Sequence, residues 1–578
     1  MLKLFKYLKP YTLKIMLMVI LIFGTVASTL ELPDYMAKII NDGIIKSNNS
    51  LIFYNGLLML LIALVGAACT IGVGYLSSKI SASFSRDVRN KVFARVESFS
   101  MVEFNKFSTA SLITRSTNDI QQIQTVMVFL LRMVLQAPIM GLWAIVKAYH
   151  LAPSLSWIIA LAVIVLLSII SVMFSVALPK FKILQKLVDR LNLVTRENLT
   201  GLRVIRAFSN EKIEEEKFEQ ANLDLTSANL FVNRLMVIMQ PSMMLIMNLT
   251  SVAVVWMGAH LINSGGLEIG NMIAFMQYAM QVIMSFLMIS VVFIMIPRAS
   301  VSAERISEVI ETEPTIKNPK IANSLKNSGN GVVEFKDVTF TYPGASTPVL
   351  ENISFIAKPG ETTAFIGSTG SGKSTLINLV PRFYDVSSGL ILIDGVDVRD
   401  YNLSDLYQKI GYVPQKGVLF SGTVSSNIKY GAPEASEDEV LNAAEISQAE
   451  EFIKNLEAKF EDPIAQGGAN ISGGQKQRLS IARAIVKNPE IYIFDDSFSA
   501  LDFKTDAALR QALKTKSKDK TVLIVAQRIS TILNAEKIIV LDNGKIVGIG
   551  SHKQLFKDCD VYKEIAYSQL SEKELTAL

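Results

Sequence analysis

Six long apolar stretches constrain this chain more than any other feature of its sequence. Each has about the 20 residues that an α-helix needs to cross the hydrocarbon core of a bilayer. Half of the 578 residues are hydrophobic and only 19% are charged, which is too apolar for a wholly soluble protein. We therefore expect six membrane-spanning helices, at approximately Leu13–Leu32, Ile52–Leu76, Val126–Ala148, Leu155–Leu178, Pro241–Ile262 and Met272–Ile296.

Lysine and arginine are distributed unevenly between the connections. They are abundant before the first stretch and in the long connections after the second and fourth, Arg86–Arg115 and Lys180–Arg206. Because basic loops stay in the cytoplasm, we expect both chain termini and both long connections to be cytoplasmic. Basic loops also account for the small net charge of +5, so we expect a lipid bilayer and no nucleic acid among the partners.

The composition changes after the sixth stretch. Glu311–Gly331 is rich in Pro, Asn, Lys, Ser and Gly, which break the apolar periodicity as a linker does. We expect a membrane domain over residues 1–312, a linker over 313–331 and a second domain over 332–578.

The sequence GSTGSGKS fits the phosphate-loop pattern. It follows a predicted strand, Thr362–Ile366, and precedes a predicted helix, Thr375–Val380, which is the context that the motif requires. Such a loop wraps phosphates with backbone N–H groups, while its lysine reaches the β- and γ-phosphates and its serine binds Mg²⁺. The predicted nucleotide-binding residues are Gly367, Ser368, Thr369, Gly370, Ser371, Gly372, Lys373, Ser374 and Thr375.

A second segment, Ile471–Asp502, complements this loop. It holds the sequence SGGQ, a basic helix, and the apolar run Ile491–Phe494, which ends in Asp495 and Asp496. A short apolar run closed by acids is typical of a buried parallel strand that delivers carboxylates to its C-terminal edge. Asp495 is therefore a candidate Mg²⁺ ligand beside the phosphates.

With these motifs in place, Val332–Gly550 resembles the nucleotide-binding domain of ATP-binding-cassette (ABC) transporters, and the whole chain resembles an exporter-type half of one. The resemblance implies an α-helical membrane domain of six long transmembrane helices followed by an α/β P-loop nucleotide-binding domain with a helical subdomain. It also implies ATP and Mg²⁺ as cofactors.

The resemblance assigns further roles. Tyr342 would stack on adenine, and Gln415 would contact the metal or the attacking water. The SGGQ signature would cover the γ-phosphate of an ATP bound by the opposite subunit; its residues are Ser472, Gly473, Gly474 and Gln475.

Two departures from the family pattern bear on hydrolysis. The catalytic glutamate of the family is here Asp496, and its switch histidine is Gln527. Aspartate withdraws the carboxylate by more than about an ångström, and such a misplacement can cost about 10²-fold in rate. A glutamine amide cannot titrate like imidazole or carry its positive charge. We therefore expect ATP binding with slow turnover.

This asymmetry resembles the degenerate-site subunit of bacterial heterodimeric multidrug ABC exporters. It implies an unlike ABC half-transporter with intact Glu and His as partner, a bacterial plasma-membrane location and a hydrophobic or amphiphilic small-molecule substrate. The alternatives are a nucleotide-sensing regulatory membrane subunit and a homodimeric lipid or peptide exporter with slow turnover.

Two segments of the long connections, Ser111–Asp119 and Thr200–Glu211, resemble the coupling helices of exporters, or are ordinary solvated helix. Arg132 lies inside the third stretch, where a charge marks a cavity unless it snorkels to the surface. Methionines recur at every fourth position of the sixth stretch, either as helix packing or as an adaptable substrate surface. The candidate cavity residues of that stretch are Met272, Met276, Gln277, Met280, Gln281, Met284 and Met288.

Overall fold

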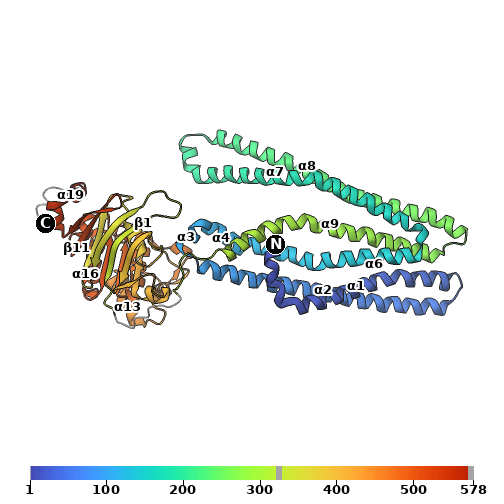
Figure 1. The fold of residues 1–578 in the computed structure, drawn as a ribbon, viewed down its shortest axis with the longest axis horizontal. Helices are drawn as coiled ribbons and strands as arrows, with labels where there is room; N and C mark the ends of the chain where they lie inside the picture. The colour runs from blue at the N-terminus through green and yellow to red at the C-terminus, as the bar shows by residue number, and fades with distance from the viewer. Residues whose placement is uncertain (1, 320–328, 571–578) are drawn as a thin grey trace. The chain divides into compact units, whose positions relative to one another are not determined.

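The computed structural model describes residues 2–319 and 329–570, which fall into two compact units (Figure 1). The first unit comprises Met1–Glu97 and Thr109–Thr312, and the second comprises Ser98–Ser108 and Glu313–Leu578. Part of the predicted linker, residues 320–328, lies outside the described residues.

The first unit is entirely helical. Among its described residues, six helical stretches are long and apolar enough to cross a membrane, which confirms the expected number of spans. The elements are η1 (Leu2–Tyr11), α1 (Thr12–Lys38), η2 (Ile39–Ile44), α2 (Asn49–Glu97), α4 (Thr109–Ser116), α5 (Asn118–Phe129), η3 (Leu130–Val134), α6 (Leu135–Leu151), η4 (Pro153–Leu155), α7 (Ser156–Ala207), α8 (Glu211–Asn263) and α9 (Ile269–Glu311).

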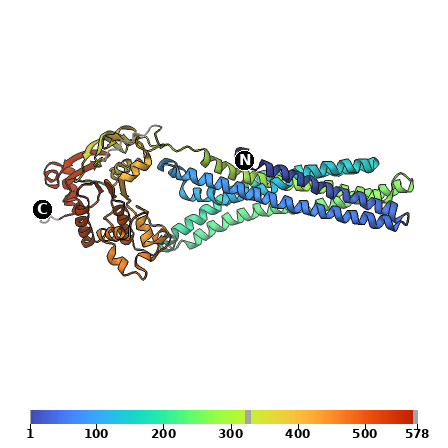
Figure 2. The same ribbon diagram turned by 90° about the horizontal axis from the view of Figure 1, so that it is seen from below.

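Several of these helices extend well beyond a bilayer. The 52 residues of α7 correspond to about 78 Å at 1.5 Å per residue, against about 30 Å of hydrocarbon. α7 and α8 run side by side in both views and are joined by a turn at Ser209, whose φ is 53° (Figures 1 and 2).

Small residues set the spacing of α1 and α2. A Cβ at Gly24 would lie 2.9 Å from the Sγ of Cys69, and one at Gly66 would lie 2.8 Å from the Cβ of Ser28. The two helices therefore approach as closely as backbones do in tightly packed membrane helices.

The second unit contains two main sheets. The six-stranded sheet has the order β12-β11-β3-β10-β9-β6, in which β11, β3, β10, β9 and β6 are parallel. The other is antiparallel, with the order β2-β1-β4-β5. The strands are β1 (Val333–Phe340), β2 (Leu350–Ala357), β3 (Thr362–Gly367), β4 (Ser388–Ile393), β5 (Val396–Asp397), β6 (Ile410–Val413), β7 (Gly422–Thr423), β8 (Pro463–Ile464), β9 (Ile491–Asp495), β10 (Thr521–Val525), β11 (Lys537–Asp542) and β12 (Lys545–Gly550).

Helices cover the parallel sheet and form a subdomain between β6 and β9. They are α10 (Lys373–Leu379), α11 (Leu403–Lys409), α12 (Val424–Lys429), α13 (Glu437–Ile446), α14 (Glu450–Lys454), α15 (Gly473–Val486), α16 (Phe503–Lys516), α17 (Ile529–Ile532), α18 (His552–Asp558) and α19 (Asp560–Tyr567). The fold thus matches the expected membrane helices followed by an α/β domain with a helical subdomain.

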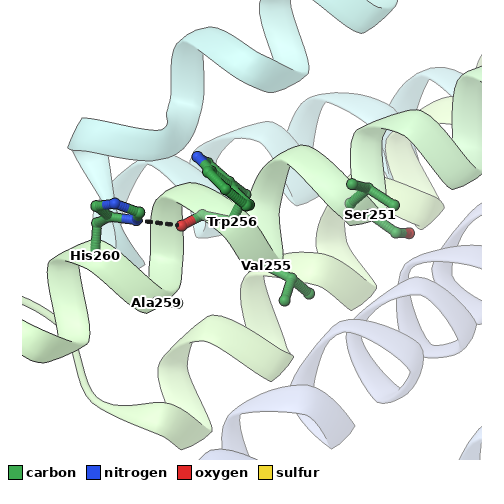
Figure 3. Close-up of a pocket in the computed structure, with 6 residues that line it drawn as sticks. Ser251, Val255, Trp256, Ala259 and His260 are labelled. Carbon is green, nitrogen blue, oxygen red and sulfur yellow. Dashed lines mark hydrogen bonds between the residues drawn. The ribbon is translucent and has the colours of Figure 1, made fainter.

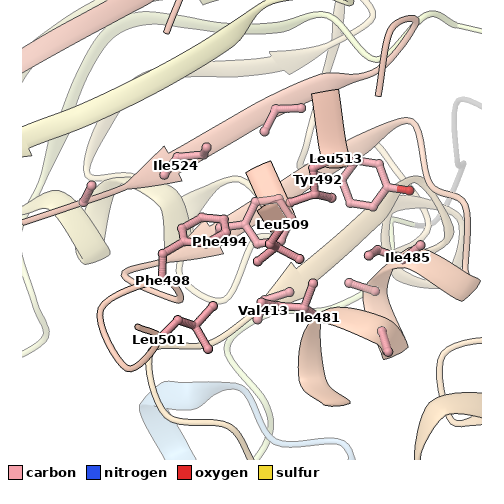
Figure 4. Packing of buried hydrophobic residues seen from close by; sticks show 14 of the residues in the cluster. Val413, Ile481, Ile485, Tyr492, Phe494, Phe498, Leu501, Leu509, Leu513 and Ile524 are labelled. Carbon is pink, nitrogen blue, oxygen red and sulfur yellow. The ribbon is translucent and has the colours of Figure 1, made fainter. Parts of the chain in front are cut away.

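The strand β9 is central to this unit because every one of its residues is buried. Tyr492 and Phe494 stack at a ring distance of 6.1 Å, and Ile481 of α15 and Leu509 of α16 belong to the same hydrophobic cluster (Figure 4). An apolar strand held from both faces fixes the position of the acids at its C-terminal end.

A short helix from the N-terminal half, α3 (Met101–Phe107), belongs to the second unit. Burial raises the pKa of Glu103, but hydrogen bonds from Ser100 and Thr315 outweigh that effect and lower it. The predicted coupling segment Ser111–Asp119 forms α4 and the start of α5, and it belongs to the first unit. The segment that belongs to the second unit is Ser98–Ser108, which precedes it in the chain.

Candidate functional site

The phosphate-loop residues connect β3 to α10 in a conformation that requires glycine. Gly370 and Gly372 have φ values of 86° and 94°, where residues with a side chain are strained. A Cβ at Gly372 would also lie 2.7 Å from the Cδ2 of Leu350, and one at Gly367 would lie 2.0 Å from the carbonyl oxygen of Leu541. The loop is therefore a cradle of bare backbone at the N-terminus of a helix, which suits phosphate.

Lys373 supplies the positive charge of this cradle. Its Nζ donates hydrogen bonds to the carbonyl oxygens of Gly367 and Ser368, at 2.9 and 2.7 Å. Burial lowers the pKa of Lys373, and the nearby charges of Asp496 and Asp495 oppose that shift. The ammonium group is thus held over the loop, and its charge complements a triphosphate.

Ser374 and Asp495 form the candidate metal site. The hydroxyl of Ser374 donates to Oδ1 of Asp495 at 2.7 Å. Burial raises the pKa of Asp495; the Ser374 hydrogen bond opposes that shift and the charge of Asp496 adds to it. One hydroxyl and one carboxylate fit Mg²⁺, which takes few protein ligands and fills the rest of its shell with water and substrate phosphates.

The three residues predicted to act in hydrolysis meet at one carboxylate oxygen. Oδ2 of Asp496 accepts a hydrogen bond from Nε2 of Gln415 at 3.1 Å and another from Nε2 of Gln527 at 2.9 Å. Asp496 is buried and its backbone φ is 46°. The structure therefore brings together three residues that the sequence singled out separately, and it points the Gln415 amide at Asp496.

The convergence follows from strand order. β6, β9 and β10 are adjacent and parallel, so the residues that follow them emerge at the same edge of the sheet. The backbone N–H of Asp496 also donates to the carbonyl oxygen of Val525 at 3.0 Å, which fixes its position beside β10.

Tyr342 lies against the phosphate-loop helix. Its hydroxyl is hydrogen-bonded to that of Thr375 at 2.9 Å, and its ring makes an edge contact with Tyr384 at 5.3 Å. Tyr384 in turn accepts a hydrogen bond from the side chain of Asn105 in α3 at 3.2 Å. The candidate adenine platform is thus linked through one ring to the helix from the N-terminal half.

The SGGQ residues begin α15. Ser472 and Gln475 form a reciprocal capping box, in which the backbone N–H of Ser472 donates to Oε1 of Gln475 at 2.9 Å. Ser472 and Gly473 are exposed, and a Cβ at Gly474 would lie 3.2 Å from the carbonyl oxygen of Ala500. The start of this 14-residue helix is open to solvent, as an anion site for a second molecule must be.

In the membrane unit, the methionine row is partly exposed. Met280 and Met284 expose 36% and 43% of their surface, while Tyr278 on the other side of α9 is fully buried. The remaining predicted residues of the row are partly buried: Met272, Met276, Gln277, Gln281 and Met288.

Arg132 lies in a π-helical turn, η3, within the third span and is exposed. The helix ends at Leu151, 19 residues further on, which is about 28 Å at 1.5 Å per residue. That length is nearly the full thickness of the hydrocarbon core. The geometry therefore favours the snorkelling interpretation, with Arg132 near one end of the span.

A partly buried polar network in the membrane unit was not anticipated from the sequence. Nζ of Lys147 lies 2.6 Å from Oε1 of Glu31 and 2.7 Å from Oδ2 of Asp34. The hydroxyl of Tyr278 shares its hydrogen between the carbonyl oxygen of Leu30, at 2.9 Å, and Oδ1 of Asp34. The network joins α1, α6 and α9. The sequence did contain a sign of this network, because Glu31 and Lys147 are charged residues inside predicted apolar stretches.

An apolar cavity of about 480 Å³ lies on α8, lined by Ser251, Val252, Val255, Trp256, Ala259 and His260 (Figure 3). Nδ1 of His260 is 3.0 Å from the carbonyl oxygen of Trp256. The cavity contains none of the predicted substrate residues.

Comparisons with known proteins agree with this architecture. The ABC transporter transmembrane region family matches residues 15–286, and the ABC transporter family matches residues 350–499. An uncharacterized ABC transporter ATP-binding protein of Mycobacterium tuberculosis is 43% identical, over 98% of this chain and 97% of that protein. An ATP-dependent lipid A-core flippase of Pseudomonas fluorescens is 31% identical, over 99% and 96%.

A bacterial Atm1-family ABC exporter, solved with ATP bound, superposes with a TM-score of 0.81 at 26% identity and covers 98% of this chain and 99% of its own. The sequence motifs, the fold and these relatives agree. The chain belongs to the ABC transporter family, as an exporter-type polypeptide in which a six-span membrane domain is fused to an ATP-binding domain.

Proposed function

We propose that this chain is one half of an ATP-driven exporter, that its own phosphate loop retains ATP and hydrolyses it slowly, and that it works with an unlike ABC subunit. The observation that carries this proposal is the bonding of Asp496 by the amides of Gln415 and Gln527.

Hydrolysis requires a group that accepts the proton of the attacking water while the bond from the γ-phosphorus to the ADP oxygen breaks. The carboxylate in that position is Asp496, which is shorter than glutamate and already receives two N–H donors on one oxygen. Both donors bind the oxygen that would have to accept that proton, which leaves it less available to the water. Gln527 cannot add the positive charge that a histidine would bring to the γ-phosphate.

ATP binding rests on a separate set of residues. The backbone of Gly367–Gly372 and the ammonium of Lys373 would hold the phosphates, and Tyr342 would carry the adenine. Ser374 and Asp495 would hold Mg²⁺, which neutralises phosphate charge when bound. The contacts of Lys373, Ser374 and Tyr342 support these assignments.

The SGGQ residues would complete the site of the partner. Ser472 and Gly473 are exposed at the start of a 14-residue helix, so the N–H groups there can meet a γ-phosphate held by another phosphate loop. The productive site of the pair would then combine this signature with the phosphate loop, Glu and His of the companion.

For the cargo we propose a hydrophobic or amphiphilic small molecule, moved across a bacterial plasma membrane with the ATP-binding domain in the cytoplasm. The partly exposed methionines of α9 support this class, because thioethers adapt to varied apolar shapes. A flippase named for lipid A-core, itself an amphiphile, is among the relatives.

The test is to capture the tagged chain from native membranes, identify its companion and reconstitute the pair. Lys373→Ala in this chain should lower the ATPase rate of the pair several-fold less than the equivalent lysine substitution in the companion. Equal losses from the two substitutions, or capture of this chain only with itself at full ATPase rate, would contradict the heterodimer.

A further inference from the structure

The side chain of Gln569 bridges the backbone on both sides of Arg528. Its Nε2 donates a hydrogen bond to the carbonyl oxygen of Gln527 at 2.8 Å, and its Oε1 accepts one from the backbone N–H of Ile529 at 2.8 Å. One amide group therefore pairs with the chain in the way that a neighbouring strand would. Nothing in the sequence singled out Gln569, which follows α19 near the C-terminus.

The loop that carries Gln527 needs this partner. α17 begins at Ile529, and its N-cap residue, Arg528, makes no side-chain capping bond. The first N–H groups of a helix have no acceptor within the helix, so Gln569 supplies the acceptor that a capping side chain would otherwise provide.

Gln569 is exposed, but its support is rigid. Tyr562 and Ala566 of α19 are fully buried, and Leu570 packs against the same core. The backbone N–H groups of Gln569 and Leu570 both donate to the carbonyl oxygen of Ala566, at 3.1 and 2.9 Å. The buried helix α19 holds Gln569 in place, and the two hydrogen bonds of the Gln569 side chain in turn fix where the Gln527 backbone lies.

We infer that Gln569 is a positioning residue for the hydrolytic end of the site: it fixes the backbone of Gln527 so that the Gln527 amide reaches Asp496 and the terminal phosphate. The C-terminal segment α18–α19 thereby controls how this chain distinguishes ATP from ADP. This inference rests on the proposed placement of Gln527 at the γ-phosphate. Gln569 itself touches no nucleotide and acts through Gln527.

The test is a double-mutant cycle on the full-length chain in lipid nanodiscs, with Gln527→Ala, Gln569→Ala and the double variant. The quantity measured is the ratio of the Kd for ADP to the Kd for ATP, from fluorescent nucleotide analogues. Gln569→Ala should lower this ratio about three- to tenfold, the size expected of one or two hydrogen bonds, with the Kd for ADP unchanged. In the Gln527→Ala background it should add nothing.

Two further variants separate positioning from general loss of structure. Gln569→Glu keeps the acceptor for Ile529 but sets a negative oxygen against the Gln527 carbonyl, so the ratio should fall at least as far as with alanine. Gln511→Ala, at an exposed position on α16, should change nothing.

An unchanged ratio in Gln569→Ala, while Gln527→Ala lowers it, overturns this inference alone. A fall of the same size in both backgrounds also overturns it, because Gln569 would then not act through Gln527. If Gln527→Ala itself leaves the ratio unchanged, Gln527 does not face the terminal phosphate, and the inference fails together with that part of the proposed function.

Discussion

The two ends of the nucleotide site are built differently. The phosphate end is made of backbone and one lysine, in a loop where Gly367 and Gly372 have no room for a side chain and Gly370 has a positive φ. The hydrolytic end is made of three side chains from three separate segments, which meet at one oxygen of Asp496. The first end is dictated by the fold, whereas the second depends on side-chain identity.

That difference would account for the proposed separation of ATP binding from ATP hydrolysis. Exchanging Glu for Asp and His for Gln leaves the backbone cradle untouched, because no strand or helix depends on those side chains. The substituted residues still form a self-consistent hydrogen-bonded group with Gln415. A chain can therefore keep its affinity for ATP while its chemistry slows.

The largest effect is expected from a substitution at the phosphate end of the site. Lys373→Ala should raise the Kd for ATP on the order of 10²- to 10⁴-fold, since charge-assisted hydrogen bonds to phosphates contribute about 1.5–3 kcal/mol each. Gln415→Ala should change the Kd by no more than a few-fold. Equilibrium binding of a fluorescent ATP analogue measures both, and equal losses would erase the distinction between the two ends.

Next in size is repair of the hydrolytic end. The double variant Asp496→Glu, Gln527→His should raise the turnover of ATP bound to this chain about 10²-fold, because the carboxylate regains its reach. The Kd for ATP should stay within a few-fold. Single-turnover ATPase rates measure the gain, and Asp496→Asn should show none. A repaired variant as slow as the natural chain would place the defect elsewhere.

A smaller effect tests the glycines of the cradle. Both Gly370 and Gly372 have positive φ, but only Gly372 is crowded, with Leu350 and the carbonyl oxygen of Val349 close by. Gly370→Ala should cost about 1–2 kcal/mol of unfolding free energy for backbone strain. Gly372→Ala should cost about 1–3 kcal/mol more for overpacking. Denaturant unfolding compares the two, and equal costs would contradict the close packing.

The smallest expected effect is a loss of stability of α18–α19 at acid pH. Burial lowers the pKa of His552, whose ring nitrogen lies 2.8 Å from the hydroxyl of Tyr562. The neutral histidine stabilises α18–α19 fully above its unfolded pKa of 6.5, and that stability is lost as pH falls through the lower folded pKa. Hydrogen exchange of α19, corrected for its intrinsic pH dependence, should therefore speed up in acid.

His552→Gln, which cannot titrate, should abolish that acid response. ADP affinity should not follow it, because the phosphate end makes no use of α18–α19. A parallel loss of ADP binding as the pH falls would show that the two ends are not independent.

The sequence predicted where the phosphate loop lies in the fold, because its motif is local and lies between a strand and a helix. It identified Asp496, Gln527 and Gln415 separately but could not predict that both glutamine amides bind one oxygen of Asp496. That contact depends on β6, β9 and β10 being neighbours, although their segments lie far apart in the chain.

The membrane unit shows the same limit. Apolar length gave the six spans, but Lys147, Glu31 and Asp34 come together only because α1 and α6 pack side by side. Gln569 carried no signal at all, since its role depends on where α19 lies on the core.

The central claim is that this chain holds ATP and scarcely cleaves it. Radiolabelled ATP is bound to the full-length chain with Mg²⁺, excess nucleotide is removed, and the bound nucleotide is identified by acid quench over time. The account predicts that the label remains ATP over many turnovers of an active ABC ATPase. Conversion to ADP within the time of one such turnover, with Asp496 and Gln527 in place, would contradict it.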